Sequence, residues 1–328
     1  MAKLNLTFGC WGYDRVQPIA DGRVKPDGIE LNFLDMPVEE TFFRQARFRE
    51  FDVSEMSLSS YTVSLFRETQ PFIAIPVWPS RFFRHSCIYV SAKSGIKTAK
   101  DLIGKKIGVP EFQMTAPVWI RGILDEHYGV PVDSVTYFKG GEEEPGRPEK
   151  QKLALPKNIK VEAIPETQTL SQMLAAGEID ALHTARAPST YDGKKVLRLF
   201  PNYVADEKAY YQNTRIFPIM HTIVIKRDLY EANRWIAQTL TKAFCQAQHL
   251  VYEGQRQTAA HMAMLPFFNA HVDEARELMG DDYWPYGFAP NIKTLETFLG
   301  YHHKCGLSKR LLKPAELFAP ETLEAFKI

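Results

Sequence analysis

Two arginines and a histidine lie within five residues of one another, directly before a β-forming apolar run. Arg81, Arg84 and His85 precede residues 87–90, which read Cys-Ile-Tyr-Val. Charged side chains are costly to bury without partners, so we interpret this stretch as a strand that begins at an anion-binding cleft. Guanidinium groups bind carboxylates through paired hydrogen bonds. In an extended chain Arg81 and His85 share one face, and Arg84 joins them only if the chain bends at Phe82 or Phe83.

A second histidine holds a matching position later in the chain. His221 opens the β-forming segment 222–225, and Arg186 follows the strand expected at 179–184. Histidine titrates near neutral pH and transfers protons readily. We therefore expect His85 and His221 to face one cleft as candidate catalytic residues, although an isolated histidine is also commonly structural. Arg186, like the earlier arginines, is a candidate ligand for an anion, the alternative being a salt bridge.

Neutral hydrogen-bond donors precede two predicted helices. Ser57 and Ser59 come before the apolar segment 61–66, and Thr115 is the expected N-cap of a helix at 116–127. Helix N-termini attract anions. No glycine-rich nucleotide motif accompanies the strand, loop and capped helix at 106–127, which favours a smaller anion. Glu111, in that loop, could orient a histidine or accept a proton.

Strands and helices alternate along the chain, which predicts α/β sheets with mostly parallel strands. The 328 residues suffice for two domains. The two histidine-opened strands bracket a compact block. We therefore predict an outer lobe from residues 1–90 and 217–328, an inserted lobe from 91–216, and a ligand cleft between them. The loop after the first strand, with Tyr13, is a further candidate binding segment.

The composition excludes several classes of partner. The net charge is +1, so neither nucleic acid nor an anionic membrane is favoured. No apolar run approaches the roughly 18 residues of a membrane span. The four cysteines are scattered, as in reducing compartments, and the N-terminus lacks the apolar core of a signal peptide. We therefore expect a cytoplasmic protein, and the sequence leaves open a homo-oligomer.

Sequence signatures of common cofactors and nucleophiles are absent. There is no H-E-x-x-H or zinc-type cysteine and histidine cluster. The adjacent His302 and His303 diverge on a helix, and no G-x-S-x-G is present. The loop 140–150 is rich in turns and charges, which we expect to be solvated. We therefore predict no bound cofactor.

Several segments resemble the 4,5-dihydroxyphthalate decarboxylase family. They are Tyr-Asp-Arg at 13–15 and the strings at 54–61, 83–86, 108–116, 140–147 and 317–321, in order along the chain. The resemblance implies a type 2 periplasmic-binding-protein-like fold used as a cytoplasmic enzyme. It also implies removal of one carboxylate from 4,5-dihydroxyphthalate to give protocatechuate and CO2.

That reaction assigns roles to the candidates. An aromatic dicarboxylate substrate needs cationic donors, for which Arg81, Arg84 and Arg186 are suited, with Tyr13, Ser57, Ser59 and Thr115 as neutral partners. A hydroxyl para to the departing group raises electron density at the ring carbon, which a general acid then protonates. His85, His221 and Glu111 are the candidate catalytic residues. A divalent ion held by the catechol oxygens with His and Glu stays an alternative, as do a solute-binding protein and another lyase on this scaffold.

Overall fold

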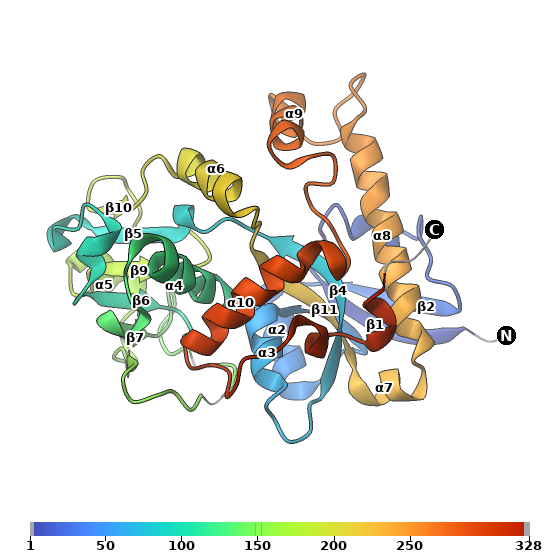
Figure 1. Cartoon of the computed structure of the whole chain (residues 1–328), viewed down its shortest axis with the longest axis horizontal. Coiled ribbons are helices and arrows are strands. Elements are labelled where there is room, and N and C mark those ends of the chain that lie inside the picture. The colour runs from blue at the N-terminus through green and yellow to red at the C-terminus, as the bar shows by residue number, and fades with distance from the viewer. Residues whose placement is uncertain (1–2, 148, 152, 325–328) are drawn as a thin grey trace.

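Two β-sheets form the centres of two lobes in the computed structural model, which describes residues 3–147, 149–151 and 153–324 (Figure 1). The first sheet has the order β2-β1-β3-β11-β4 and the second β10-β5-β9-β6-β7-β8. The strands of the first sheet are β1 (Leu4–Cys10), β2 (Ile29–Asp35), β3 (Val53–Ser57), β4 (Phe72–Arg81) and β11 (Ile219–Lys226). Those of the second are β5 (Ile88–Ser91), β6 (Lys106–Val109), β7 (Thr136–Lys139), β8 (Lys160–Ala163), β9 (Ala181–His183) and β10 (Val196–Arg198). The predicted two-lobed α/β architecture is confirmed.

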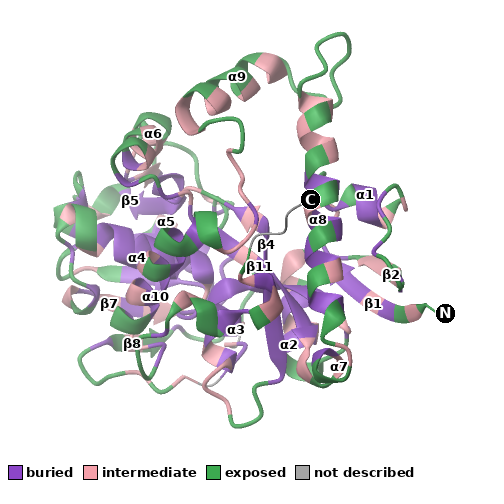
Figure 2. Cartoon of the chain, turned by 45° about the vertical axis from the view of Figure 1, so that its right-hand side comes forward, coloured by how far each residue is buried: buried purple, intermediate pink, exposed green. Residues whose placement is uncertain are grey.

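Helices cover both sheets. They are α1 (Gln17–Ala20), α2 (Val38–Phe48), α3 (Leu58–Ser64), α4 (Thr115–Tyr128), α5 (Leu170–Ala176), α6 (Tyr203–Thr214), α7 (Arg227–Ala232), α8 (Trp235–Gln255), α9 (Phe268–Met279) and α10 (Ile292–Lys304). Figure 2 shows buried residues concentrated in the strands and in α4, whereas α9 stands out from the body and has no buried residue. None of the helices within the described residues combines the length and apolarity needed to cross a bilayer.

Both sheets are mixed rather than wholly parallel. β1 pairs in parallel with β2 and β3, and β6 does so with β7 and β9. β11 runs antiparallel to β3 and β4, because it carries the chain back from the second lobe and enters the first sheet from the opposite end. β5 is likewise antiparallel to its neighbours β9 and β10. The returning strand β11 thereby lies between β3 and the edge strand β4.

The chain crosses between the lobes earlier than the boundary expected at residue 90. β4 ends at Arg81, the segment 82–87 crosses, and β5 already belongs to the second sheet. The strand expected to begin at His85 therefore begins at Ile88, and residues 85–87 form a short 3-10 turn. The second crossing precedes β11 at Ile219, close to the expected boundary at 217.

The C-terminal part contacts both lobes rather than the outer lobe alone. Helix α10 packs along α4, and Trp119 meets Phe298 and Tyr301 at ring-centroid distances of 5.6 Å. Gly122 permits this approach, because a Cβ atom there would overlap the ring of Tyr301. Protein interiors pack as densely as crystals, so the contact with α10 holds α4 in place, and with it the end of α4 that faces the cleft.

Candidate active site

A cavity of about 290 Å³ lies between the lobes. It collects side chains from both sheets and from both sides of the first crossing. The predicted site residues among those that line it are Tyr13, Ser57, Arg84, Thr115, Arg186 and His221. Residues from six separate chain segments thus meet where the two-lobed topology predicts a ligand.

Strand pairing places a carboxylate behind the cleft histidine. His221 on β11 pairs with Ser57 on β3, and Glu55 lies two residues before Ser57 on the same face of the strand. The Nδ1 atom of His221 donates to Glu55 Oε1 over 2.5 Å, and the hydroxyl of Tyr13 donates to the same oxygen over 2.8 Å. The ring of Phe42 meets the imidazole edge-on at 4.8 Å between centroids. These contacts fix both the tautomer and the orientation of His221.

The electrostatics of this group favour an ionised carboxylate. Glu55 has no exposed surface; burial alone would raise its pKa, yet His221 and then Tyr13 hold the pKa of Glu55 below its usual value. Burial and the charge of Glu55 raise the pKa of Tyr13, so this phenol stays a donor. The His221 Nε2 atom forms no hydrogen bond with any residue that the structure describes, and the side chain faces the cavity. The imidazole can therefore exchange a proton with a ligand there.

Arg84 brings to the cavity a positive charge that has no direct ion pair among the described residues, although Glu207 lies near enough to feel it. Its guanidinium donates to the carbonyl of Ala185 over 3.1 Å, contacts the sulfur of Met220 at 3.1 Å, and lies over the ring of Phe82. It forms no ion pair with any carboxylate in the described part of the chain, although the residue is only 6% exposed. A buried cation with neutral partners is strongly stabilised by an arriving anion.

Hydroxyl groups join the lobes beside this cation. Ser57 Oγ and Thr115 Oγ1 are 2.8 Å apart, and the backbone N–H of Ser59 donates to Thr115 Oγ1 over 3.0 Å. Thr115 is the first residue of α4 rather than its N-cap, a position that Met114 takes. Ser59 is buried behind the cavity, because in a helix it cannot point the same way as Ser57. The start of α4, with its free amide groups, therefore faces the ligand space.

Five charged groups form a network at the cavity. Glu111 is fully buried and accepts from Arg147 over 2.8 Å and from the ammonium group of Lys150. Glu39 on α2 accepts from Arg147 over 2.9 Å and pairs with Arg186. Glu111 thus orients two cations rather than a histidine. Because Glu39 belongs to the first lobe and the arginines to the second, the network also links the lobes.

Arg147 and Lys150 correct the expectation that the charges of loop 140–150 are solvated. Both line the cavity, and the Lys150 side chain is only 3% exposed. The loop folds back over the cleft because its charges find the buried Glu111, a tertiary partner that local composition does not reveal. Glu55 was missed for the same reason, although its place two residues before Ser57 on a strand signals a shared face.

Arg81 and His85 lie outside the cavity. Arg81 donates to the carbonyl groups of Phe217 over 2.9 Å and of Pro285 over 2.8 Å, and also to the side chain of Asn291. It therefore ties the second crossing and the segment before α10 to β4. For an extended chain Arg81 and His85 were expected to face the cleft. The chain instead bends after β4, and this bend turns Arg84 toward the cleft.

His85 occupies an aromatic enclosure. Its ring meets those of Phe200, Tyr210 and Tyr128 at 5.1, 5.4 and 5.8 Å between centroids, and neither ring nitrogen has a hydrogen-bond partner among the described residues. Burial, and then the neighbouring His127, lower the pKa of His85 to about 4. At neutral pH this histidine is uncharged and away from the ligand, so it is not placed to donate a proton there.

The charged residues that line the cavity, taken together with Glu111, leave an excess of two positive units when the Glu55 and His221 pair is counted as neutral. The cations are Arg84, Arg147, Lys150 and Arg186, and the opposing carboxylates are Glu39 and Glu111. Such an excess is suited to a dianionic ligand. In the described part of the chain no three His, Cys, Asp or Glu side chains converge as metal ligands.

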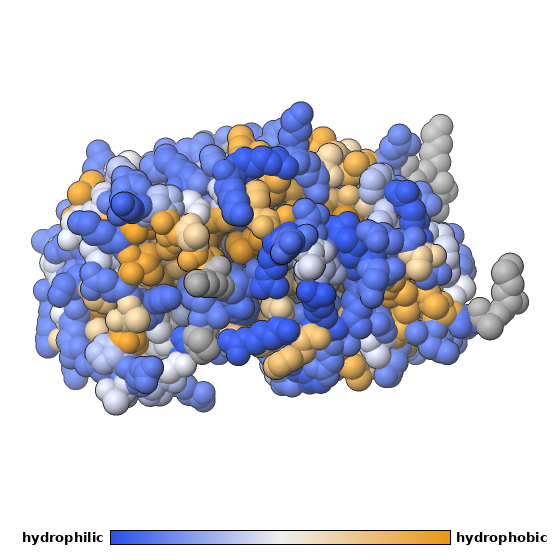
Figure 3. Space-filling model, turned by 90° about the horizontal axis from the view of Figure 1, so that it is seen from below, coloured by the Kyte–Doolittle hydropathy of each residue, from blue (hydrophilic) through white to orange (hydrophobic). Residues whose placement is uncertain are grey.

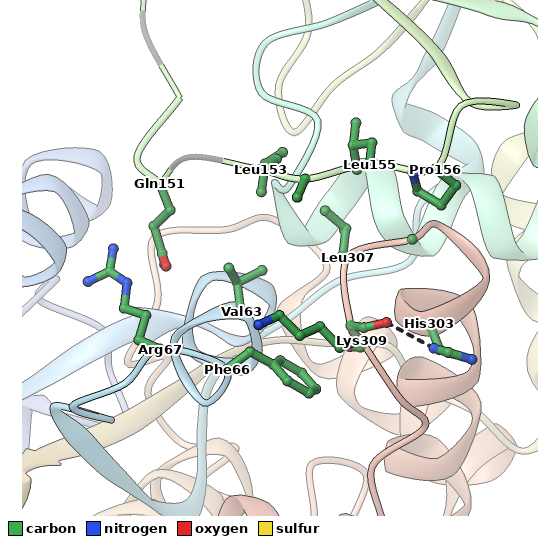
Figure 4. Close-up of a pocket in the computed structure, with 13 residues that line it drawn as sticks. Val63, Phe66, Arg67, Gln151, Leu153, Leu155, Pro156, His303, Leu307 and Lys309 are labelled. Atoms are coloured by element: carbon green, nitrogen blue, oxygen red, sulfur yellow. Dashed lines mark hydrogen bonds between the residues drawn. The ribbon is translucent and has the colours of Figure 1, made fainter.

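A larger hollow of about 580 Å³ lies on an outer face between α3, residues 151 and 153–156, and the chain after α10. That face is mostly polar, with apolar surface in patches (Figure 3). Figure 4 shows that Val63, Phe66, Leu153 and Leu307 line the hollow. Its one histidine, His303, points its Nδ1 at a carbonyl group over 3.0 Å. Among the described residues no carboxylate lines it, so the cleft, not this hollow, has the groups for acid–base chemistry.

Known proteins resemble the chain in sequence and in fold, although no family model matches it. It is 44% identical over 330 residues to a 4,5-dihydroxyphthalate decarboxylase of Comamonas testosteroni, with 100% of both chains covered. It is also 50% identical over 191 residues to a 4,5-dihydroxyphthalate decarboxylase of Pseudomonas putida, covering 58% of this chain and 74% of that one.

Solved structures share the architecture at low sequence identity. The periplasmic aliphatic sulphonate binding protein SsuA of Escherichia coli superposes with a TM-score of 0.53 at 12% identity, covering 98% of this chain and 99% of that one. A periplasmic sulfonate-binding protein of Methylobacillus flagellatus gives 0.54 at 13% identity, covering 98% and 94%. These likenesses confirm the type 2 periplasmic-binding-protein-like fold and nothing further. The full-length identity to the Comamonas protein shows more: this chain belongs to the 4,5-dihydroxyphthalate decarboxylase family.

Proposed function

We propose that this protein removes one carboxylate from 4,5-dihydroxyphthalate and releases protocatechuate and CO2. Family membership supports the reaction. The observation from the structure that carries the proposal is the cleft itself. There a carboxylate-oriented imidazole, His221, shares one small cavity with an unpaired guanidinium, Arg84. A proton donor beside an anion-binding group is what decarboxylation of an aromatic dianion requires.

Substrate binding uses the charge excess of the cavity. We assign one carboxylate to Arg84, whose neutral partners leave its charge unsatisfied, together with the first amide groups of α4. The two carboxylates of free 4,5-dihydroxyphthalate are equivalent by symmetry. Only the orientation of the bound substrate therefore decides which carboxylate stays at Arg84 and which one leaves. Either orientation yields the same product.

The chemical step is a proton transfer followed by loss of CO2. The imidazolium of His221 donates its Nε2 proton to the ring carbon that bears the departing carboxylate, and the N–H bonding pair stays on nitrogen. The carbon–carboxylate bond then breaks, CO2 leaves, and the bonding pair restores the aromatic ring. Glu55 stabilises the imidazolium through its charged hydrogen bond, as a carboxylate does in other oriented histidine pairs. Solvent returns the proton to His221 for the next cycle.

The test incubates the purified protein with 4,5-dihydroxyphthalate while CO2 release is followed and the aromatic product is identified by chromatography. We expect equimolar protocatechuate and CO2, and a loss of about 100-fold or more in kcat for His221→Asn. Tight binding without turnover would instead identify a solute-binding protein, and a different product another lyase. Gel filtration of the same sample tests the homo-oligomer that the sequence leaves open.

A further inference from the structure

The cavity has two cationic regions of different character. At Arg84 the direct partners of the guanidinium are neutral, and Glu207, whose charge it feels, does not line the cavity. At the other region, which we call the loop cluster (Glu111, Arg147 and Lys150), cations and a carboxylate touch each other. Glu39 adds a second carboxylate beside Arg147. The two regions therefore suit different parts of one ligand.

Donor and acceptor capacity tells these parts apart. A carboxylate ligand only accepts hydrogen bonds, and it would be repelled by Glu39, which lines the cavity at the loop cluster. A phenolic hydroxyl both donates and accepts, so it can satisfy a carboxylate and a cation at once. The catechol end of a dihydroxyphthalate thus matches the loop cluster, and its two carboxylates match Arg84 and the start of α4.

Helix α2 separates the loop cluster from the proton donor. Phe42 packs against the ring of His221, while the next residue, Phe43, lies 4.7 Å from the ammonium group of Lys150 and 5.6 Å from the guanidinium of Arg147. Consecutive side chains on a helix point about 100° apart. His221 and Lys150 therefore approach the cavity from different directions around this helix, as an acid at one ring carbon and a cation at the opposite oxygen must do.

We propose that Lys150 is a catalytic residue that binds the phenolate oxygen para to the departing carboxylate, within a loop cluster that holds the catechol end of the substrate. This assignment rests on the proposed decarboxylation. The hydroxyl para to the departing carboxylate loses its proton to solvent, and the phenolate accepts a hydrogen bond from the Lys150 ammonium. The neighbouring hydroxyl keeps its proton and donates to Glu39, which also lines the cavity. As His221 protonates the ring carbon, an oxygen electron pair forms a carbonyl bond. When CO2 leaves, the bonding pair restores the ring and the phenolate. Lys150 keeps its proton throughout.

Burial is the largest influence on Lys150 and lowers its pKa below the ordinary value, while Glu111 and Glu39 oppose this shift and Arg147 adds to it. The direct ion pair with Glu111 favours the ammonium form against burial. The Lys150 side chain is almost wholly shielded from water. Water-poor surroundings strengthen charge–charge attraction, which favours an ionised catechol beside this group.

The ionisation of the bound ligand tests the proposal without turnover. Catechol absorbance shifts to longer wavelength on ionisation, so 4,5-dihydroxyphthalate bound to His221→Asn is titrated with pH in an ultraviolet spectrometer. We expect its first catechol ionisation at least one pH unit below that of the free compound. Adding Lys150→Met should bring it back to the free value, whereas Lys150→Arg should preserve most of the shift. If the catechol of the bound ligand ionises at the same pH with Lys150→Met added as in His221→Asn alone, the proposal is wrong.

Phthalate, which lacks hydroxyls, separates the two regions. By calorimetric titration Lys150→Met should change phthalate affinity less than twofold, and Arg84→Met should weaken it at least tenfold. If Lys150→Met weakens phthalate as strongly as 4,5-dihydroxyphthalate, Lys150 binds a carboxylate and the assignment is wrong. Should Lys150→Met fold poorly with Glu111 left partly unpaired, the pair Glu111→Gln with Lys150→Met removes both charges. Failed CO2 release from the unaltered protein would reject the proposed function, while these binding results would still decide the role of Lys150.

Discussion

The Glu55→Gln substitution tests the pairing that makes His221 an acid. Glutamine has nearly the shape of glutamate, and its side-chain oxygen can still accept from Tyr13. The negative charge that faces His221 Nδ1 over 2.5 Å is lost. Glu55 is completely buried, and burial alone would raise its pKa, but His221 holds the pKa below its usual value. The substitution therefore removes a real charge at neutral pH.

The expected magnitude follows from the strength of that hydrogen bond. A hydrogen bond to a charged group contributes about 1.5–3 kcal/mol, and about 1.4 kcal/mol of barrier corresponds to a tenfold change in rate. Without the charge of Glu55 the transition state for proton transfer from His221 loses stabilisation of that size. We therefore expect kcat to fall roughly 10- to 100-fold.

The assay measures kcat and KM for CO2 release between pH 5 and 9. We expect kcat to fall in Glu55→Gln across this range, with KM changed little because Glu55 does not line the cavity. Tyr13→Phe is the matched control, since it removes a hydrogen bond from the same oxygen but leaves the charge. A Glu55→Gln profile that superposes on the unaltered one would refute the role of this pair, and thermal unfolding of both variants checks that they fold.

Four further substitutions probe the binding group, an excluded residue, a titrating carboxyl and the helix contact. Arg84→Met should raise KM about tenfold or more through loss of a charged contact, with kcat affected less; an unchanged KM would contradict its role. His85→Phe should keep kcat. Burial lowers the pKa of His85 to about 4, so below about pH 6.5 the unfolded chain takes up a proton that the folded protein does not, which destabilises the unaltered protein. The variant is free of this loss and should gain up to about 2 kcal/mol of unfolding free energy at pH 5 relative to pH 8. A large kcat loss would restore His85 as an acid. Burial raises the pKa of Glu142 to about 7 despite its hydrogen bond from Thr184, so the unaltered protein loses stability as pH rises through that value. In denaturant titrations Glu142→Gln should gain at most about 3 kcal/mol of unfolding free energy at pH 8 relative to pH 5. An equal effect at both pH values would argue against a titrating Glu142. Gly122→Ala should lower the free energy of unfolding by about 1–3 kcal/mol through overpacking against α10, which an unaltered melting temperature would contradict.

Much of the architecture was determined by local pattern. Alternating strands and helices predicted two α/β lobes, and residues 222–225 were correctly read as part of the strand that returns the chain, because a β-forming apolar run is a local property; the strand itself begins earlier, at Ile219. The antiparallel direction of β11 was not predictable in the same way. Strand direction depends on where the chain re-enters the sheet, which no stretch of eight residues records.

The residues of the cleft divide along the same line. His221, Arg84 and Thr115 were predicted from the sequence because each stands where an element begins or where the chain bends, and such positions can be located locally. The tertiary structure alone decided that Arg84 rather than Arg81 and His85 faces the cavity, since one bend after β4 reverses every later side chain. It also decided that Glu55, Arg147 and Lys150 belong there, because burial creates the need for a charged partner and that partner is distant in sequence.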